Sequence, residues 1–332
     1  VTSSQFWHAF DHAAGCDTQD FATTWIVQPG FPLLTAERDI NRVHLRQQRF
    51  TYLPHDSNER WFIPIELLLL RQGDRCETIS LLLDEEETAV AIPSDTIAYK
   101  LNHNQTGFYR VRCDDRNLAA LGQYVRTQQL SAIDNFGLQN DHFALVKRGD
   151  YVVDDYLQFV ESYFTAEKRY LPLYDIARSL QSLYLLLPLR REKIARVGLI
   201  LCDNALHESG LEPQKNDSHH TTLLRKSLLW MASSFGSAAA ILFGIDSFSR
   251  LLAGRSVPAD ILPTVLKAGA AAHNDAFDYL MDHLVSGDLA EAEMTPYLAA
   301  MGHFPGGQEL QQALAANLQF CPKNLRAHLI LA

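Results

Sequence analysis

The chain has 332 residues, of which 47% are hydrophobic and 20% are charged, and its formal net charge is −10. This composition predicts a folded protein with room for about two domains and excludes a disordered chain. The chain has 39 acidic and 29 basic residues. This acidic excess argues against binding to a phosphate backbone, so nucleic acid is not an expected partner.

Residues 1–33 predict two short helices. The first has Ser3 or Ser4 as its cap and carries three aromatic side chains on one side, Phe6, Trp7 and Phe10. The second covers 17–25, and the prolines and glycine of 28–32 then predict a turn into an extended strand. No signal peptide is expected, because the segment lacks a basic start and an apolar run. Since the chain does not begin with Met, we expect a natural start upstream of it.

Residues 34–113 alternate between apolar and polar side chains and predict strands at 42–46, 49–53, 61–70, 78–83, 88–92, 98–102 and 108–113. Short strands separated by polar turns are typical of a β-sandwich with one buried and one wetted face. The acidic run 84–87 stands where a hairpin is expected to turn. We interpret it as a solvated loop rather than a cation site.

The stretch 101–115 separates the β-like part of the chain from a helical part. Within it, 104–107 predicts a polar turn in which Gly107 takes a positive φ. Asp114 or Asp115 is expected to cap the first long helix.

From residue 114 to 332 the sequence repeats helices and helix breakers. We expect Asp150 to cap a helix with a stripe from Val152 to Phe164, and Gly210 to end one that carries Ile194, Val197, Leu201 and Ala205. Pro258 is expected near the start of a helix at 259–268, and further helices at 274–285, 295–301 and 308–318. The predicted fold class is multidomain β then α: a small β-sandwich followed by an irregular all-α, HEAT/armadillo-like helical stack, or α-solenoid.

The uncharged segment 227–245 is long enough to cross a bilayer, but its small polar residues at 233–237 favour a turn between two buried helices. No membrane span is therefore expected. The five cysteines are far apart and form no C-x-x-C pair, which indicates reduced thiols: Cys16, Cys76, Cys113, Cys202 and Cys321.

Catalytic and metal-binding patterns are weak in this sequence. His207-Glu208 lacks the second histidine of H-E-x-x-H, and His219-His220 is interpreted as a surface loop pair. No G-x-S-x-G elbow or P-loop occurs, and a solvated face explains the basic cluster 190–193. We interpret three tryptophans as core residues: Trp25, Trp61 and Trp230. The residues alone therefore assign no catalytic residue, no metal ligand and no cofactor, although a triad dispersed along the chain remains an open alternative.

Four pieces of sequence carry a resemblance. They are 24–34 with Trp25, Pro29, Gly30 and Pro32; 61–65 with Trp61 and Pro64; 104–111 with Asn104, Gly107 and Tyr109; and 141–146, which begins with Asp141. In this order and spacing they resemble the C-terminal half of an aminopeptidase N-like zinc aminopeptidase of the gluzincin family. The pair Asp134-Asn135 departs from the family's Asp-Arg, so the ion pair of that arginine is expected to be lost.

The resemblance implies three regions: 1–33 as the helical tail of a thermolysin-like catalytic domain, 34–113 as a β-sandwich, and 114–332 as a helical domain that covers the active site. The helical region stops early at Ala332, which suggests a truncated chain or a shortened domain. The family's zinc motif, its distal glutamate ligand, its exopeptidase motif and its transition-state tyrosine have no counterpart here. The resemblance therefore implies that zinc is bound by a catalytic domain upstream of Val1.

On this hypothesis the chain is the non-catalytic C-terminal portion of a cytoplasmic, zinc-dependent aminopeptidase that removes N-terminal residues from peptides, and it shapes and covers the peptide-access cavity. Its partners would be the upstream catalytic domain and, through the full enzyme, peptide substrates, and the isolated portion would self-associate. A stand-alone helical protein-interaction module is the alternative. An upstream H-E-x-x-H would favour the peptidase, and an open reading frame that begins near Val1 would favour the module.

Overall fold

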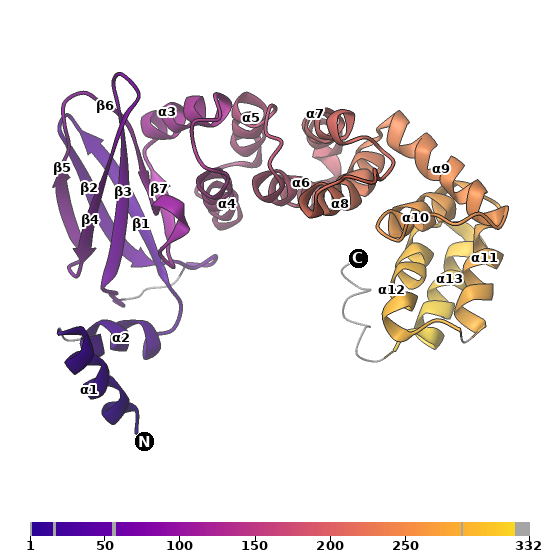
Figure 1. Ribbon diagram of the computed structural model, residues 1–332, viewed down its shortest axis with the longest axis horizontal. Helices are drawn as coiled ribbons and strands as arrows, with labels where there is room; N and C mark the ends of the chain where they lie inside the picture. Colours follow the sequence, from indigo (N-terminus) through magenta and orange to yellow (C-terminus); the bar gives the residue numbers. More distant parts are fainter. Residues whose placement is uncertain (1, 16–17, 55–57, 287, 323–332) are drawn as a thin grey trace. The chain divides into compact units, whose positions relative to one another are not determined.

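The computed structural model describes residues 2–15, 18–54, 58–286 and 288–322 (Figure 1). The chain divides into two compact units, Val1–Ile176 and Ala177–Ala332. All strands that the structure describes belong to the first unit, and the described elements of the second are helical. The predicted order of β then α is confirmed.

The two N-terminal helices are α1 (Ser3–Ala14) and α2 (Thr18–Ile26). The prediction that Ser3 or Ser4 caps α1 was wrong. Thr2 is the cap, because its Oγ1 accepts a hydrogen bond from Gln5 N at 3.3 Å while the Gln5 side chain accepts one from Thr2 N at 3.0 Å. The rings of Phe6, Trp7 and Phe10 do contact one another, and the centroids of Phe6 and Trp7 lie 5.0 Å apart.

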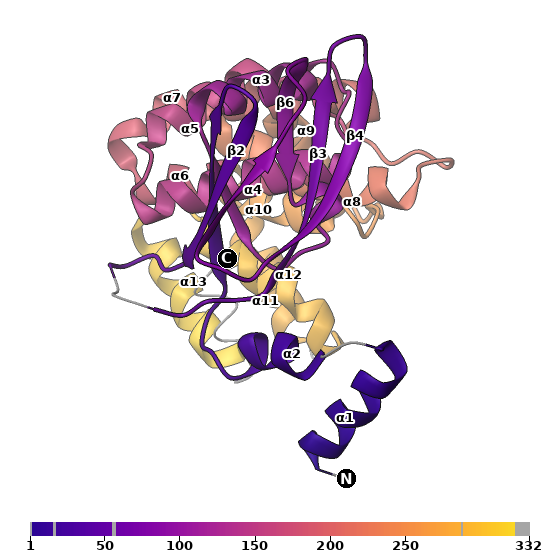
Figure 2. The same ribbon diagram turned by 90° about the vertical axis from the view of Figure 1, so that its left-hand side faces the viewer.

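The seven strands within the described ranges form two sheets, which Figure 2 shows after a turn of 90° from Figure 1. The strands are β1 (Pro32–Asp39), β2 (Arg42–Arg49), β3 (Ile63–Arg71), β4 (Arg75–Leu83), β5 (Glu87–Ala91), β6 (Thr96–Leu101) and β7 (Arg110–Cys113). The sheet orders are β5-β2-β1-β7 and β4-β3-β6, and all pairs are antiparallel except β1 with β7. Alternate side chains are buried in β2, among them Val43 and Leu45, as expected for a sandwich.

Two expectations for the sandwich were wrong. A separate strand at 49–53 does not form, because β2 continues to Arg49, which pairs with Pro32 at the start of β1. The acidic run 84–87 does not turn a hairpin, since it connects β4 in one sheet to β5 in the other. There the Gln47 backbone N donates to Glu86 O at 2.9 Å, and the side chains of Glu85 and Glu86 remain exposed near Arg60.

The first helices after the sandwich are α3 (Asp115–Arg126), α4 (Ala132–Arg148) and α5 (Val153–Tyr163). Asp114 caps α3 as predicted, with its Oδ1 accepting from Asn117 N at 2.8 Å. Asp150 does not cap α5. The backbone N of Val152 donates instead to Asp155 Oδ2 at 3.1 Å, and Asp150 lies 3.4 Å from Arg148 Nε.

Helix α6 (Tyr170–Leu186) runs from the first unit into the second. The second unit then contains α7 (Arg191–Ser209), α8 (His219–Phe235), α9 (Ala238–Leu252), α10 (Leu262–Ala272), α11 (Ala276–Val285), α12 (Glu291–Ala300) and α13 (Gly307–Phe320). Three short 3₁₀ turns complete the described helices: η1 (His103–Gln105), η2 (Pro188–Arg190) and η3 (Met301–His303).

Details of the second unit correct two predictions and confirm one. His219 and His220 lie in the first turn of α8 rather than in a loop, because Ser218 caps that helix. Pro263, not Pro258, occupies the first turn of α10. The stripe Ile194, Val197, Leu201 and Ala205 is buried on α7, and Gly210 follows the helix end as expected.

The apolar segment 227–245 is split between α8 and α9 at Gly236, whose φ is 95°. The two helices meet at a bend of 111°. Over the described ranges, no single helix is long and apolar enough to cross a membrane, although this bent pair has the required length and composition. Among the cysteines, Cys76 is exposed, and Cys113, Cys202 and Cys321 are buried and free. Cys16 lies outside the described residues.

The core contains Trp61, which is fully buried, whereas Trp25 and Trp230 are half-buried. Trp230 packs against two cationic or titratable groups, with Lys267 Nζ 4.7 Å from its ring centroid and the His303 ring centroid at 4.4 Å. No hydrogen bond or ion pair joins Lys267 Nζ to any residue in the part of the chain that the structure describes. Burial lowers the pKa of this lysine, and burial likewise lowers the pKa of His303 to about 4.

We expect Lys267→Met to stabilise the second unit by about 1 kcal/mol at pH 7, because an unpaired, half-buried ammonium costs more than the contact with Trp230 returns. The folded protein binds fewer protons at this lysine than the unfolded chain does, so the cost is present below the lowered folded pKa and disappears as the pH rises above 10.5. Urea unfolding at pH 7 and at about pH 11.5 measures both effects. The exposed Lys226→Met, on α8, is the control, and an equal gain from both variants would contradict the explanation.

Candidate functional site

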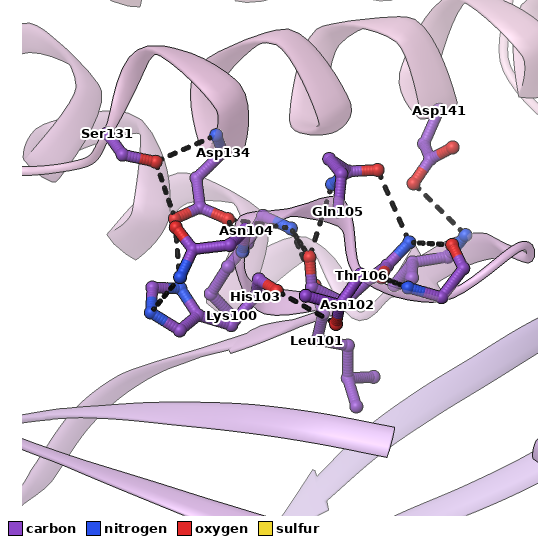
Figure 3. A network of polar contacts seen from close by, with 12 residues as sticks. Lys100, Leu101, Asn102, His103, Asn104, Gln105, Thr106, Ser131, Asp134 and Asp141 are labelled. Carbon is purple, nitrogen blue, oxygen red and sulfur yellow. Dashed lines mark hydrogen bonds and ion pairs between the residues drawn. The ribbon is translucent and has the colours of Figure 1, made fainter. Parts of the chain in front are cut away.

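The feature that joins the β part to the helices is a loop of six residues, 102–107, which we call the junction loop. It follows β6, contains η1 and leads into β7, and helix α4 lies directly above it (Figure 3). Most of the polar side chains that the sequence motifs contributed to this region point from α4 toward the loop or from the loop toward α4.

The backbone of the junction loop is unusual at three residues that are not glycine. Asn102, Asn104 and Gln105 have φ values of 54°, 55° and 53°. Asparagine tolerates this region, but glutamine does not favour it, so the loop stores on the order of 1 kcal/mol per strained residue. Such a conformation persists only where the surroundings determine it.

Gly107 was predicted to supply the positive φ, and that prediction was wrong, because its φ lies outside the left-handed region. The glycine is required for a different reason. A Cβ at this position would lie 2.2 Å from Cε1 of Tyr109, so any side chain would collide with that buried ring. Backbone N of Gly107 also donates to Asn102 Oδ1 at 2.8 Å.

Asp134, in the first turn of α4, holds the loop from above (Figure 3). Its Oδ1 accepts from Asn104 N at 2.9 Å, and its Oδ2 accepts from Ser131 Oγ at 2.9 Å and lies 3.0 Å from His103 Nδ1. Lys100 Nζ is 3.8 Å from Oδ1, and both side chains are almost completely buried. The carboxylate therefore satisfies the strained backbone and balances a buried cation.

A second set of contacts fixes the inside of the loop. Asn102 Nδ2 donates to Gly107 O at 3.0 Å and to Gln105 Oε1 at 3.2 Å. The Gln105 side chain lies against α4 at Gly137, where a Cβ would come within 1.7 Å of Gln105 Nε2. The absence of a side chain at Gly137 thus leaves room for the Gln105 side chain to pack against α4.

Asp141, two turns further along α4, binds the backbone of strand β7 (Figure 3). Its Oδ2 accepts from Val111 N at 3.2 Å, and Arg110 Nη1 lies 3.0 Å from Oδ1. Burial raises the pKa of Asp141 to about 6, although Arg110 and Lys100 act in the opposite direction. Burial also lowers the pKa of Lys100 against the attraction of Asp134 and Asp141.

Asn135 stands where the resemblance implied an arginine. Its Nδ2 donates to the buried Glu167 Oε2 at 2.7 Å, and Arg169 Nη2 pairs with the same oxygen at 2.7 Å. An arginine two residues after the glutamate therefore neutralises the carboxylate beside Asn135. Burial acts to raise the pKa of Glu167, but the hydrogen bonds and charge of Arg169, together with the hydrogen bond from Asn135, hold it below its usual range.

His142 follows Asp141 on α4 and lies among aromatic rings, 4.6 Å from Tyr151 and 4.7 Å from Phe159 between centroids. The side chain is 4% exposed, and its Nε2 is buried without a hydrogen-bond partner. Burial lowers the pKa of His142 to about 4, although the carboxylates of Asp155 and Asp115 raise it. The imidazole is therefore neutral at pH 7.

We expect His142→Phe to make the first unit more resistant to acid. The folded pKa of His142 is depressed, so its contribution to stability is present above pH 6.5 and is lost as the pH falls toward 4. The loss amounts to about 3 kcal/mol at pH 4 relative to pH 7. Asp141 titrates in the opposite sense in both proteins, so comparing the two isolates the histidine. Urea unfolding between pH 7 and 4 is the measurement, with the exposed His44→Phe as control, and parallel pH profiles would contradict the prediction.

The other motif residues gather at a second place, where α2 meets the sandwich. The rings of Trp25 and Trp61 lie 6.4 Å apart, and Trp25 Nε1 donates to Phe62 O at 2.9 Å. Gly30 has a φ of 89°, and a Cβ there would lie 2.8 Å from Arg49 Nε. Pro29 precedes this turn, Pro32 begins β1 and Pro64 lies in β3. The structure thus brings Asn104, Gly107, Tyr109, Asp134 and Asp141 together and keeps the Trp25 group separate.

Sequence analysis missed Lys100, Asn102 and Gly137 as members of the network. An isolated glycine inside the helical pattern 132–148 was a usable signal for Gly137. Lys100 gave no comparable signal, because its partner Asp134 lies about 30 residues further along the chain. Asn102 binds Gln105 and Gly107 within its own loop, and no pattern of residue types in the sequence indicated those contacts.

The junction fits a structural role, since its charges and backbone groups bind one another. Within the described ranges, no group of three His, Cys, Asp or Glu side chains is disposed to hold a metal ion. The zinc that the resemblance implies therefore does not fit these side chains.

Comparison with known proteins agrees with the fold. Residues 98–329 match the family model described as ERAP1-like C-terminal domain. The chain is 26% identical over 193 residues to leucyl aminopeptidase of Saccharolobus solfataricus, covering 58% of this chain and 23% of that protein. It is 29% identical over 185 residues to tricorn protease-interacting factor F2 of Thermoplasma volcanium, covering 56% and 22%. It is 25% identical over 284 residues to aminopeptidase M1 of Arabidopsis thaliana, covering 81% and 32%.

The sandwich, the junction and the helices that follow are those of the C-terminal portion of an aminopeptidase N-like enzyme. The chain belongs to the ERAP1-like C-terminal domain family. It spans between 22% and 32% of the length of these three relatives.

Proposed function

We propose that this chain is a non-catalytic part of a zinc-dependent aminopeptidase and that it shapes and covers the cavity through which peptides reach the active site. The observation that carries the proposal is the family match over residues 98–329 together with relatives named as aminopeptidases. The enzyme as a whole would remove N-terminal residues from peptides.

The zinc ion and the acid–base groups of the reaction would belong to a catalytic domain elsewhere in the same polypeptide. Support comes from the described side chains, which offer no set of metal ligands, and from the greater length of the relatives. The proposed location of the enzyme is the cytoplasm.

A covering domain needs first helices whose direction is fixed. The junction would fix that direction. A strained loop held by Asp134 and Asp141 has few alternative conformations, because each alternative would leave a buried charge or backbone group without a partner. Helix α4 is therefore held firmly on the sandwich. A rigid base of this kind suits a cover that must exclude water from a reaction.

The aromatic side of α1 is the proposed contact with the catalytic domain. Phe6 and Phe10 are 50% and 51% exposed although their rings pack together. Without that contact the isolated chain would bury these rings by self-association. Light scattering over a range of concentrations measures this, and a monomer at all of them would contradict the proposed contact.

Blocking the helices in the complete polypeptide tests the covering role. Single cysteines are placed at one exposed position on each helix from α5 to α13, with Cys16 and Cys76 replaced by serine, and each is labelled with a bulky polyethylene glycol maleimide. The proposal predicts that labels on some helices strongly lower kcat/KM for a long peptide and leave hydrolysis of a single-residue amide nearly unchanged.

A label at Ile40→Cys, an 81% exposed residue between β1 and β2, provides the matched control on the sandwich. If every helical label leaves the ratio of peptide to amide hydrolysis at the value of this control, the covering role is wrong. The helices would then fit a surface for binding other proteins better.

A further inference from the structure

A groove of about 380 Å³ opens on the surface of the first unit between α3 and α5. Its volume lies at the lower end of the range of small-molecule sites, about 300–1,000 Å³. Six of its lining residues carry the argument below: Asp115, His142, Tyr151, Asp155, Phe159 and Tyr163. None of them belongs to the contacts that hold the junction loop.

The walls of the groove are aromatic. Phe159 is buried, Tyr151 and Tyr163 are half-buried, and the Phe159 and Tyr163 rings meet edge to face at 5.6 Å between centroids. Tyr163 reaches α3 at Gly122, where a Cβ would lie 2.6 Å from its ring. The glycine therefore makes room on α3 for an aromatic side chain from α5.

The rim of the groove is acidic. Asp115 and Asp155 are both exposed and line the groove from the first turns of α3 and α5. Asp155 Oδ2 accepts from Val152 N, which leaves its other oxygen open. Across the ranges that the structure describes, no lysine or arginine forms an ion pair with either carboxylate. Arg112 lies 6.0 Å from the Tyr151 ring centroid but is paired with Asp150 and does not line the groove.

His142 places part of its ring against the groove. The side chain is 4% exposed and lines the groove, and its Nε2 has no hydrogen-bond partner. A neutral imidazole protonated on Nδ1 presents Nε2 as an acceptor. A buried polar atom without a partner is uncommon in folded proteins and calls for a ligand or a bound water.

We propose that the groove between α3 and α5 is a binding site for an alkyl cation, an ammonium or guanidinium group on a short apolar stem. The two carboxylates would attract the charge, and the aromatic faces would hold the stem and stabilise the cation beside the His142 ring. An anionic ligand is disfavoured by the same carboxylates. The site is independent of the aminopeptidase proposal, because every residue in it belongs to this chain.

Titration of the full chain with n-butylammonium, followed on the ¹³C-labelled His142 ring by NMR, tests the site. The resonance is assigned by its loss in His142→Asn. The proposal predicts a saturable shift with n-butylammonium and with n-butylguanidinium, and no such shift with 1-butanol or butyrate. Raising the salt concentration to 0.5 M should weaken binding, because the rim charges are exposed.

Variants of the rim complete the test. Asp115→Asn and Asp155→Asn should each weaken binding of n-butylammonium by about two- to fivefold, as expected for a partly exposed ion pair. The asparagine at 155 keeps an acceptor for Val152 N, so the start of α5 is preserved. Asp154→Asn, which removes the same charge from the same helix turn outside the groove, should change binding by less than either. Saturable binding of 1-butanol of equal strength, an equal effect of Asp154→Asn, or no shift with either cation would overturn the proposal.

Discussion

Asp134→Ala is expected to destabilise the first unit by about 3–5 kcal/mol, the cost of removing one partner of a buried charge pair. The substitution leaves Asn104 N without its acceptor in a strained segment, and it deprives the buried Lys100 of a counter-charge. Asp134→Asn keeps an oxygen for the backbone but not the charge, so its loss should be smaller. Urea unfolding followed by circular dichroism at pH 7 measures all three proteins.

Two further variants separate the causes of this loss. Asp115→Ala removes an exposed carboxylate from the first turn of α3 and should change stability by less than about 1 kcal/mol. Adding Lys100→Met to Asp134→Ala should recover part of the loss, since the unpaired ammonium is then gone. An Asp134→Ala protein that unfolds at the same urea concentration as the parent would show that the carboxylate does not hold the junction.

Arg225→Met is expected to destabilise the second unit by about 3 kcal/mol or more, again because buried partners lose their counterpart. The Arg225 side chain is fully buried on α8, where Nε donates to Gly210 O at 2.9 Å and Nη2 to Ser209 O at 2.6 Å. Nη1 lies 2.7 Å from Asp217 Oδ2. One guanidinium thus binds the end of α7 and the loop that follows it. Thermal and urea unfolding of the full chain measure the loss.

The control for this variant is Arg250→Met, the same substitution on α9. Arg250 is half-exposed and pairs with Glu212 and Asp246 at the surface, so its loss should cost at most about 1 kcal/mol. Arg225→Lys keeps the charge but not the planar fork and should lie between the two. The hydrogen bond from Arg225 lowers the pKa of Asp217, so this stabilisation is present above pH 3.8, is lost as the pH falls further, and should be absent from Arg225→Met. Equal losses for Arg225→Met and Arg250→Met would contradict the assignment.

The β part followed by a helical part could be predicted from the sequence, because periodicity changes from two to 3.6 near residue 101. Local signals succeeded where one residue dominates, as with Asp114 before α3 and Gly210 after α7. They failed where two local partners compete. Asp150 was predicted to cap α5, but the side chain of Asp155 accepts the hydrogen bond from Val152 N at the start of that helix. His219 was predicted to lie in a loop, but Ser218 caps a helix that begins at His219.

The candidate site could be predicted only in part, because its physical cause is tertiary. The motif supplied Gly107, but its role is to make room for Tyr109 rather than to adopt a positive φ. The strained backbone conformation lies at Asn102, Asn104 and Gln105. Asp134 on α4 stabilises it by accepting a hydrogen bond from Asn104 N. No periodicity in the sequence indicates which helix will meet a given loop.

Peptidase and zinc measurements on the purified 332-residue chain test the central claim most directly. The chain is first stripped of metal and then supplied with zinc, and release of N-terminal residues from peptides and aminoacyl amides is followed together with the zinc content of the protein. The account predicts no zinc-dependent release above a protein-free blank and no stoichiometric zinc. Release that requires zinc, stops with a chelator and accompanies one tightly bound zinc ion per chain would contradict it.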